Sequence, residues 1–275
     1  MAPRIFILLA AAAGIFASAA HAADEQPAAS VGAPRKDSES YIVTLGAMGA
    51  VAPSFPGSAL LRPYPFPTIG FRKADEPERF STPDEGFGIP LVDKDGIRMG
   101  PVANFVFRRG NRDGLYGVHQ VGLTHEIGGF AEYSTLDHFR TRAELRQGID
   151  GHEGFVAALG ADFYNKASAF TLSLGPRLNF GNNAYANSYF SVSPGEAELN
   201  GRLQPYQAQG GFTAAGGLAT IRYDITPNFN ATVFGGLQRL TGSVGASPIP
   251  NLIGSRDQFT AGLSFNRSFE VQKFW

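Results

Sequence analysis

Hydrophobic and polar residues alternate along much of the chain after residue 40. From Phe170 to Phe180 the even positions hold Phe, Leu or Pro, and the odd positions hold small or polar residues. The same period of two returns at 97–107, 154–163 and 258–266. Because successive side chains of a strand point to opposite faces, this pattern predicts strands with one apolar face and one polar face.

The alternating segments have the length of strands that cross a bilayer. Such a strand needs about 9–11 residues when it is tilted. Two segments alternate weakly, 80–91 and 187–193, so ten strands is the alternative to twelve. The segment 209–225 changes its apolar phase near Leu218, where a bulge could shift the pattern. The predicted strands are 41–51, 64–72, 80–91, 97–108, 115–133, 138–148, 154–164, 168–180, 187–193, 209–225, 229–240 and 256–272.

Strand length also separates two kinds of β protein. Soluble β-sandwiches and periplasmic lipid-binding barrels alternate as well, but their strands are shorter and their apolar faces point inward. In lipid every unpaired backbone group is costly, so a membrane sheet must close. The pattern therefore favours an all-β fold, a closed antiparallel transmembrane β-barrel.

The first 22 residues have the features of a cleaved signal peptide. Arg4 is followed by an apolar stretch from Ile5 to Ala20, and Ala20-His21-Ala22 fits the small-x-small cleavage rule. Residues 23–40 are rich in Pro, Ala, Ser and charge, which predicts a flexible periplasmic lead-in. The barrel would then occupy 41–275, in the outer membrane. An even number of strands would leave both chain ends in the periplasm.

Composition removes several classes of function. The chain has no cysteine, which excludes disulfides, thiolate metal sites, cysteine nucleophiles and a lipoprotein anchor. A formal charge of −1 gives no electrostatic basis for nucleic-acid binding. Charged residues are 17% of the chain, below the roughly 25% of soluble domains.

Motifs for catalysis and for metal binding are missing from the sequence. His119 and His125, six residues apart on one predicted strand, would lie about 20 Å apart, too far to share a metal. Ser134 precedes His138, but without a Gly-x-Ser-x-Gly motif both are better interpreted as turn residues. We therefore predict a non-enzymatic protein with no catalytic, metal or cofactor-binding residue.

One polar pattern suggests what fills the barrel. On the strand 138–148, one side holds Phe139, Thr141, Ala143 and Leu145, and the other side holds Arg140, Arg142, Glu144 and Arg146. An arginine facing mid-bilayer lipid costs about 2–4 kcal/mol, so the charged face must line the lumen. We favour a paired ion network that fills a narrow lumen over a selective pore lining. The candidate lumen charges are Arg98, Glu126, Glu132, Arg140, Arg142, Glu144, Arg146, Asp162 and Arg177.

The order of several short motifs resembles one family. A Gly-rich segment from Val43 to Arg72 contains the turn Pro53-Ser54-Phe55-Pro56-Gly57-Ser58. An acidic residue often follows this turn in the family, where this chain has Ala59, and Phe55 stands where Tyr is common. Together with later matches, the chain resembles the MltA-interacting protein (MipA/OmpV) family. The later matches are Gly128–Tyr133, Gly151–Gly154, Tyr185, Tyr189–Ser193, Arg239-Leu240 and Ser247–Ile249.

The resemblance implies an outer-membrane barrel, and it offers several roles. The name-giving member is regarded as a scaffold that joins a lytic transglycosylase to a peptidoglycan synthase. Other members are discussed as solute channels or adhesins. We therefore expect a scaffold whose partners are outer-membrane lipid, a murein transglycosylase and a peptidoglycan synthase. The alternatives are a passive small-solute channel and an adhesin that would use the loops 52–63, 194–208 and 241–255.

Overall fold

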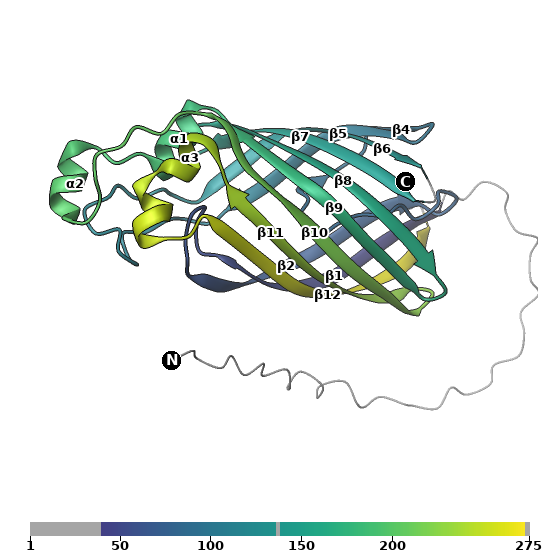
Figure 1. Cartoon of the computed structure of the whole chain (residues 1–275). Coiled ribbons are helices and arrows are strands. Elements are labelled where there is room, and N and C mark those ends of the chain that lie inside the picture. Colours follow the sequence, from purple (N-terminus) through teal and green to yellow (C-terminus); the bar gives the residue numbers. More distant parts are fainter. Residues whose placement is uncertain (1–39, 136–137, 273–275) are drawn as a thin grey trace, which may run out of the picture. The chain divides into compact units, whose positions relative to one another are not determined.

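A twelve-stranded antiparallel sheet, curled on itself, dominates the computed structural model, which describes residues 40–135 and 138–272 (Figure 1). The predicted signal peptide and nearly all of the lead-in lie outside the described residues. The strands are β1 (Ser40–Pro53), β2 (Leu61–Lys73), β3 (Phe87–Gly88), β4 (Val92–Lys94), β5 (Ile97–Val106), β6 (Thr124–Thr135), β7 (Phe139–Ile149), β8 (Phe155–Ala167), β9 (Phe170–Gly181), β10 (Gly211–Thr226), β11 (Phe229–Leu240) and β12 (Asp257–Gln272).

The two faces of the sheet differ as the alternation predicts. Along β9, Phe170, Leu172 and Leu174 are exposed, whereas Thr171 and Ser173 between them are buried. An apolar outer face with a polar, buried inner face is the arrangement of a barrel in lipid. In the described part of the chain, the helices are all too short or too polar to span a membrane.

The backbone ladder is continuous except at one place. Strands run in the order β2-β1-β12-β11-β10-β9-β8-β7-β6-β5-β3, and β4 also pairs with β5. Ser40 pairs with Gln272, so the first and last long strands lie side by side. Among the described residues no ladder joins β2 to β3, β4 or β5. We call this gap the seam. The sequence predicts a sheet that backbone pairing closes completely, but the observed ladder is open at the seam.

Ten strands are long, and the two weakly alternating segments are the exceptions. Most of the predicted strand 80–91 is irregular, with only the two-residue β3 inside it. The predicted strand 187–193 is wrong, because Asn183–Phe190 forms the helix α1. The Asn182 side chain caps this helix by accepting a hydrogen bond from the Tyr185 backbone N–H at 3.1 Å. Ala186, Tyr189 and Phe190 are buried at helical spacing.

The change of apolar phase near Leu218 has a cause other than a bulge. The register shifts of β10 lie at 212–214 and 224–226, away from Leu218. Leu218 keeps its inward position and packs there with Ala50 and Phe234. The inner face is therefore partly apolar where it approaches the end at which β10 begins.

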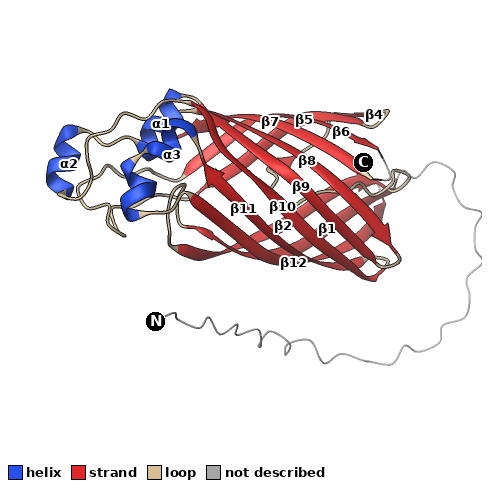
Figure 2. Cartoon of the chain, viewed as in Figure 1, coloured by secondary structure: helices blue, strands red, loops and turns tan. Residues whose placement is uncertain are grey.

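The long loops and the helices gather at one end of the sheet (Figure 2). Besides α1, this end holds α2 (Pro194–Asn200), α3 (Gly242–Ala246) and the π-helical turn η1 (Ile249–Ile253). We call residues 54–60, 107–123, 182–210 and 241–256 the cap. Two clusters of buried apolar residues hold the cap together, so these loops are packed rather than separate. The predicted strand 115–133 begins only at Thr124, because its first part belongs to the cap.

At the opposite end the connections β4–β5, β8–β9 and β10–β11 are short turns. Asp95 and Gly96 join β4 to β5, and both have positive φ angles, 53° and 82°. This is the two-residue hairpin turn that an Asp-Gly pair favours.

Candidate functional site: the charged interior

Charged side chains cover the inner face of five neighbouring strands, β5 to β9. The structure places all nine predicted lumen charges there and joins them in one network of ion pairs. All of them are buried or half-buried. The residues are Arg98 on β5, Glu126 and Glu132 on β6, Arg140, Arg142, Glu144 and Arg146 on β7, Asp162 on β8, and Arg177 on β9.

Arg140 is the centre of the network. Its side chain is 1% exposed and lies between three carboxylates. The distances from its guanidinium nitrogens are 2.6 Å to Glu85, 2.9 Å to Glu132 and 3.5 Å to Asp162. A buried charge is tolerated only when it is paired in this way.

A second branch of the network runs along β7 toward the cap. Arg142 donates to Glu144 at 2.8 Å, and its guanidinium carbon lies 3.9 Å from the centre of the Phe130 ring. Arg146 contacts both Glu144 and Glu126. This branch ends under the cap, where β7 meets the turn 150–154.

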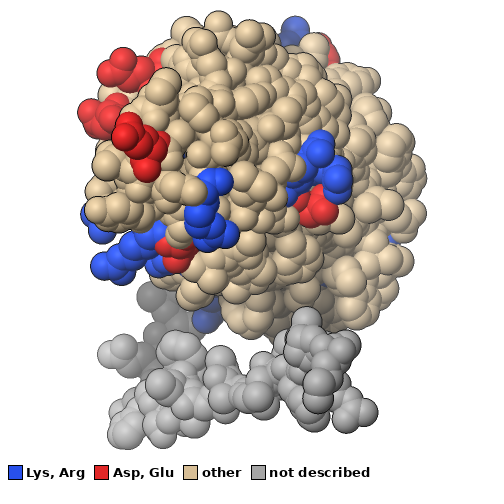
Figure 3. Space-filling view, turned by 60° about the vertical axis from the view of Figure 1, so that its left-hand side comes forward, with Lys and Arg blue, Asp and Glu red and all other residues tan. Residues whose placement is uncertain are grey.

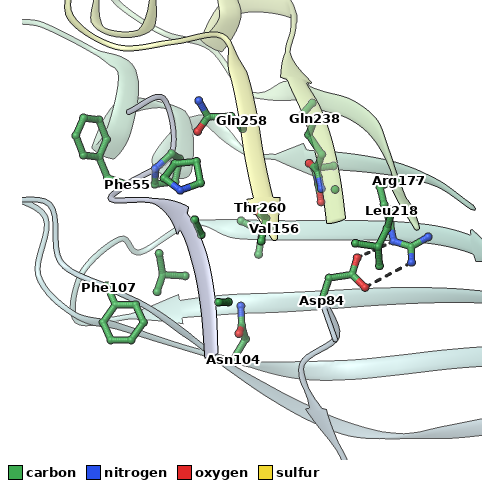
Figure 4. A pocket seen from close by; sticks show the side chains of 18 of the residues that line it. Phe55, Asp84, Asn104, Phe107, Val156, Arg177, Leu218, Gln238, Gln258 and Thr260 are labelled. Carbon is green, nitrogen blue, oxygen red and sulfur yellow. Dashed lines mark hydrogen bonds and ion pairs between the residues drawn. The ribbon is translucent and has the colours of Figure 1, made fainter. Parts of the chain in front are cut away.

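Three carboxylates come from the segment between β2 and β3, which the sequence analysis placed in a strand only from residue 80 onward. Residues 74–86, which we call the inner segment, turn inward after β2 instead of pairing as a strand. Asp84 accepts from Arg177 at 2.6 Å, as Figure 4 shows, and Glu85 accepts from Arg140 at 2.6 Å. Glu78 pairs with Arg222 of β10 at 2.6 Å. The inner segment is thus held by strands β7, β9 and β10.

Packing also fixes the inner segment. The Phe80 ring stacks on Tyr164 of β8, with ring centres 4.5 Å apart. A Cβ atom on Gly86 would lie 2.6 Å from Cγ2 of Val102, so only glycine fits so close to β5. The sequence does contain a signal for this irregular segment, because 73–85 is dense in charge and proline and lacks alternation.

The inner segment separates two cavities, of about 450 and 790 Å³. Pro83 and Asp84 line both of them. The smaller cavity lies under the cap and has apolar walls, including Phe55 and Leu218, with Gln238 and Gln258 among its polar groups (Figure 4). The larger cavity lies on the other side of the inner segment.

Ser134 and His138, which were considered for catalysis, have different hydrogen-bonding partners in the structure. The Ser134 hydroxyl accepts from Arg79 at 3.2 Å, and the His138 ring contacts the Tyr164 carbonyl oxygen at 3.3 Å. His119 lies in the cap, whereas His125 lies on β6. Within residues 40–135 and 138–272, no three His, Asp or Glu side chains are placed to hold a metal ion.

Comparison with known proteins identifies the family. The family model described as MltA-interacting protein MipA matches residues 45–269. The chain belongs to this family. No curated protein matches the sequence. Together with the apolar outer face of the sheet, family membership supports an outer-membrane barrel protein.

Solved outer-membrane proteins are similar at low identity. One is the COG4313 outer membrane channel from Pseudomonas putida F1, 10% identical, with a TM-score of 0.43 over 86% of this chain and 97% of that chain. Another is the channel DcaP of Acinetobacter baumannii, also 10% identical, with a TM-score of 0.33 over 85% of this chain and 97% of that chain.

Two motifs shared with the family have structural explanations. Phe55, from the Pro-rich turn, is buried in the cap, and the Gly57 backbone N–H donates to Gln258 at 2.9 Å. His152, from the Gly-His-x-Gly turn, is fully buried, and its Nε2 lies 3.0 Å from Glu126. Its Nδ1 accepts from the Gly154 backbone N–H, so Nε2 carries the proton. The turn thereby ties the cap end to the charged network.

Glu196 joins two parts of the cap. Its carboxylate accepts from the backbone N–H groups of Ser193 and His119, each at 2.7 Å, and lies 2.7 Å from the His119 ring. Burial opposes the charged form, but these hydrogen bonds outweigh it and lower the pKa of Glu196 from 4.5 to about 2.

Viewed with the cap end turned forward, the surface carries few charges, in separate patches (Figure 3).

This depressed pKa predicts that the cap loosens in acid. A carboxylate whose folded pKa lies below its unfolded value stabilises the fold above pH 4.5 and loses that contribution as the pH falls toward 2. Amide hydrogen exchange of residues 183–200, corrected for its intrinsic pH dependence, should therefore lose protection between pH 4.5 and 2. The variant E196Q should be less protected at neutral pH and lack this transition.

Glu198 provides the matched control, because it is an exposed acid on the same helix. E198Q should behave as the unmodified protein does. An unchanged pH profile in E196Q would contradict the assignment.

Proposed function

We propose that this protein is a non-enzymatic outer-membrane scaffold for peptidoglycan-remodelling enzymes. The observation that carries the proposal is the inner segment, which is paired to the barrel wall at Glu78, Asp84 and Glu85. A lumen divided by a bound segment and covered by a packed cap favours a membrane anchor over an open pore. The family description suggests a transglycosylase partner, and a peptidoglycan synthase would be the second.

The partner surface would be the end opposite the cap. In this proposal the chain is exported through the periplasm, both chain ends stay there, and the cap faces the outside. The short turns at the same end of the sheet as Ser40 and Gln272 would then face the periplasmic enzymes. Among them is the β4–β5 turn, where the Lys94 side chain is 82% exposed.

The test is direct binding of a purified lytic transglycosylase to the full-length protein in lipid nanodiscs. We expect saturable binding that K94E weakens several-fold. The matched charge reversal R202E, at an exposed cation of the cap, should leave it unchanged. Absence of binding by a correctly folded barrel would overturn the proposal, as would equal weakening by the two variants.

A second function, a passive small-solute channel, is favoured by the two interior cavities. It predicts reproducible conductance steps of the unmodified protein in a planar bilayer. The scaffold proposal predicts silence there, because the inner segment stays bound. One planar-bilayer recording of the unmodified protein therefore distinguishes the two functions.

A further inference from the structure

The seam is flanked by two edges of different kinds. On one side, β3 and β4 pair with β5, and backbone N–H groups of Ile89 and Leu91 donate to carbonyls of that strand. On the other side is β2, which pairs with β1 along its whole length without a register shift. Among the described residues the free edge of β2 faces no strand partner.

Proline keeps this edge of β2 from pairing. Pro63, Pro65 and Pro67 occupy alternate positions, so their nitrogens face the same edge of the strand. That edge cannot be the one toward β1, because three missing donors would interrupt the unbroken ladder. The seam edge therefore lacks three successive donors in its half nearer the cap, which disfavours pairing there with β5 or with a strand from another protein.

Aromatic rings close the cap end of the seam. The Phe107 ring, just after β5, stacks on Tyr64 of β2 with ring centres 4.5 Å apart, and lies 5.8 Å from the Phe66 ring. These contacts hold the two edges together without backbone hydrogen bonds. Farther from the cap no such ring pair bridges the seam in the described residues.

The larger cavity lies along the seam. Its lining includes seven consecutive residues of β2, from Phe66 to Arg72. Thr68 and Gly70 hold inner-face positions, whereas Ile69 and Phe71 hold outer-face positions and are 66% and 58% exposed. Residues from both edges of the seam line this cavity, Ile69 and Phe71 on β2 with Phe87 and Phe105 on the other side, so it reaches the unpaired gap in the wall.

The chemistry of the lining changes across the wall. On the outer side it is apolar, with Phe71, Phe87 and Phe105. On the inner side it carries hydroxyl and amide groups, including Thr44, Thr220, Asn230, Ser264 and Asn266.

One cation of this lining, Arg72, has no acidic partner among the described residues. The Arg72 guanidinium donates to the backbone carbonyls of Glu76 and Lys73. Among the described residues it has no carboxylate within 4.0 Å, whereas every other Arg and Lys of this lining has at least one. These are Arg79, Arg98, Arg142, Lys166 and Arg222.

We propose that the seam admits the hydrocarbon chain of a single-chain anionic amphiphile, a long-chain fatty acid, whose carboxylate lies in the larger cavity beside Arg72. The apolar outer lining suits the hydrocarbon chain, and the hydroxyl and amide wall with Arg72 suits the head group. A volume of about 790 Å³ lies within the roughly 300–1,000 Å³ of small-molecule sites. The site is independent of the scaffold function and does not require conduction through the inner segment.

The test uses a fatty acid with a photoreactive diazirine near its carboxylate end. The full-length protein in nanodiscs is illuminated with this probe, and the modified residues are located by mass spectrometry. We expect adducts on inner-face residues such as Met48 and Thr68, which lipid around the barrel cannot reach. Adducts confined to outer-face residues such as Leu174, as exposed as Ile69, would overturn the proposal.

Two glycine variants test entry through the seam. Gly70 holds an inner-face position beside the cavity, and a Cβ there would lie 3.3 Å from the Thr44 Cβ, so G70F places a ring in the cavity. Gly49 holds an outer-face position of β1 with nothing within 4 Å of a Cβ, so G49F is the matched control. G70F should abolish the inner adducts and G49F should keep them. Inner adducts that persist in a folded G70F would overturn the seam as the route.

Arg72 tests the head group. R72Q should weaken labelling by the acid a few-fold, as expected for one partly exposed ion pair, and leave labelling by the methyl ester of the same probe unchanged. Equal effects on the acid and the ester would overturn the carboxylate assignment. Heat-modifiable mobility of each variant on gels establishes that the barrel is folded.

Discussion

Replacing Arg140 with methionine is expected to lower the free energy of unfolding by about 3–5 kcal/mol. The substitution keeps the unbranched stem and removes a charge that lies within 3.5 Å of three carboxylates. Glu132, whose side chain is 1% exposed, would then keep only its longer contacts with Arg98 and Arg142. Equilibrium unfolding in urea, with the barrel refolded into lipid vesicles, measures the change.

Arg239 is the matched control for this prediction. It forms an ion pair with Asp257 at 2.7 Å, as short as the pairs of Arg140, but both side chains are more than half exposed. Exposed pairs contribute about 0.2–1 kcal/mol, so R239M should change stability little. Similar effects of R140M and R239M would mean that burial does not set the strength of the interior network.

Replacing Glu85 with glutamine is expected to release the inner segment and produce conductance. Glu85 accepts from Arg140 at 2.6 Å and from the Thr82 backbone and hydroxyl, also at 2.6 Å. A hydrogen bond to a charged group is worth about 1.5–3 kcal/mol. Losing it should raise the population of the released segment by roughly 10- to 150-fold. Planar-bilayer recording would show frequent channel openings in E85Q where the unmodified protein is silent.

Asp75 lies in the same segment and controls for the loss of one negative charge. It is exposed, and no side chain among the described residues pairs with it, so D75N should leave the recording silent. Openings in both variants would assign the effect to charge alone. Silence in a folded E85Q would mean that the other contacts of the segment, at Glu78, Phe80 and Asp84, are sufficient to hold it.

The wall of the barrel was predictable because its physics is local. Alternation fixes which side chains face inward, and the cost of an arginine in lipid assigns the charged face of β7 to the interior. Antiparallel hairpins then bring Glu132 opposite Arg142 and Arg140 opposite Asp162. Neither step needs information about distant parts of the chain.

The inner segment and the cap were not predictable for the opposite reason. Glu85 reaches Arg140 across 55 residues, and nothing in the local sequence indicates that a polar stretch folds into a lumen. In α1, the tyrosines favour a strand by propensity, but burial of Tyr189 and Phe190 under the cap decides for a helix. Tertiary packing overrides the local preference in both places.

The arrangement of the charges along the chain has a consequence for the order of assembly. Eight of the nine wall charges lie on β6 to β9, which are consecutive hairpins, and the carboxylates of the inner segment precede them. The β1–β12 ladder, by contrast, joins residues such as Thr44 and Ser268, which are 224 positions apart. Loop closure over such a distance is slow. We therefore expect the interior to be neutralised early, so that the last step of insertion joins two strands around a core that is already electrically balanced.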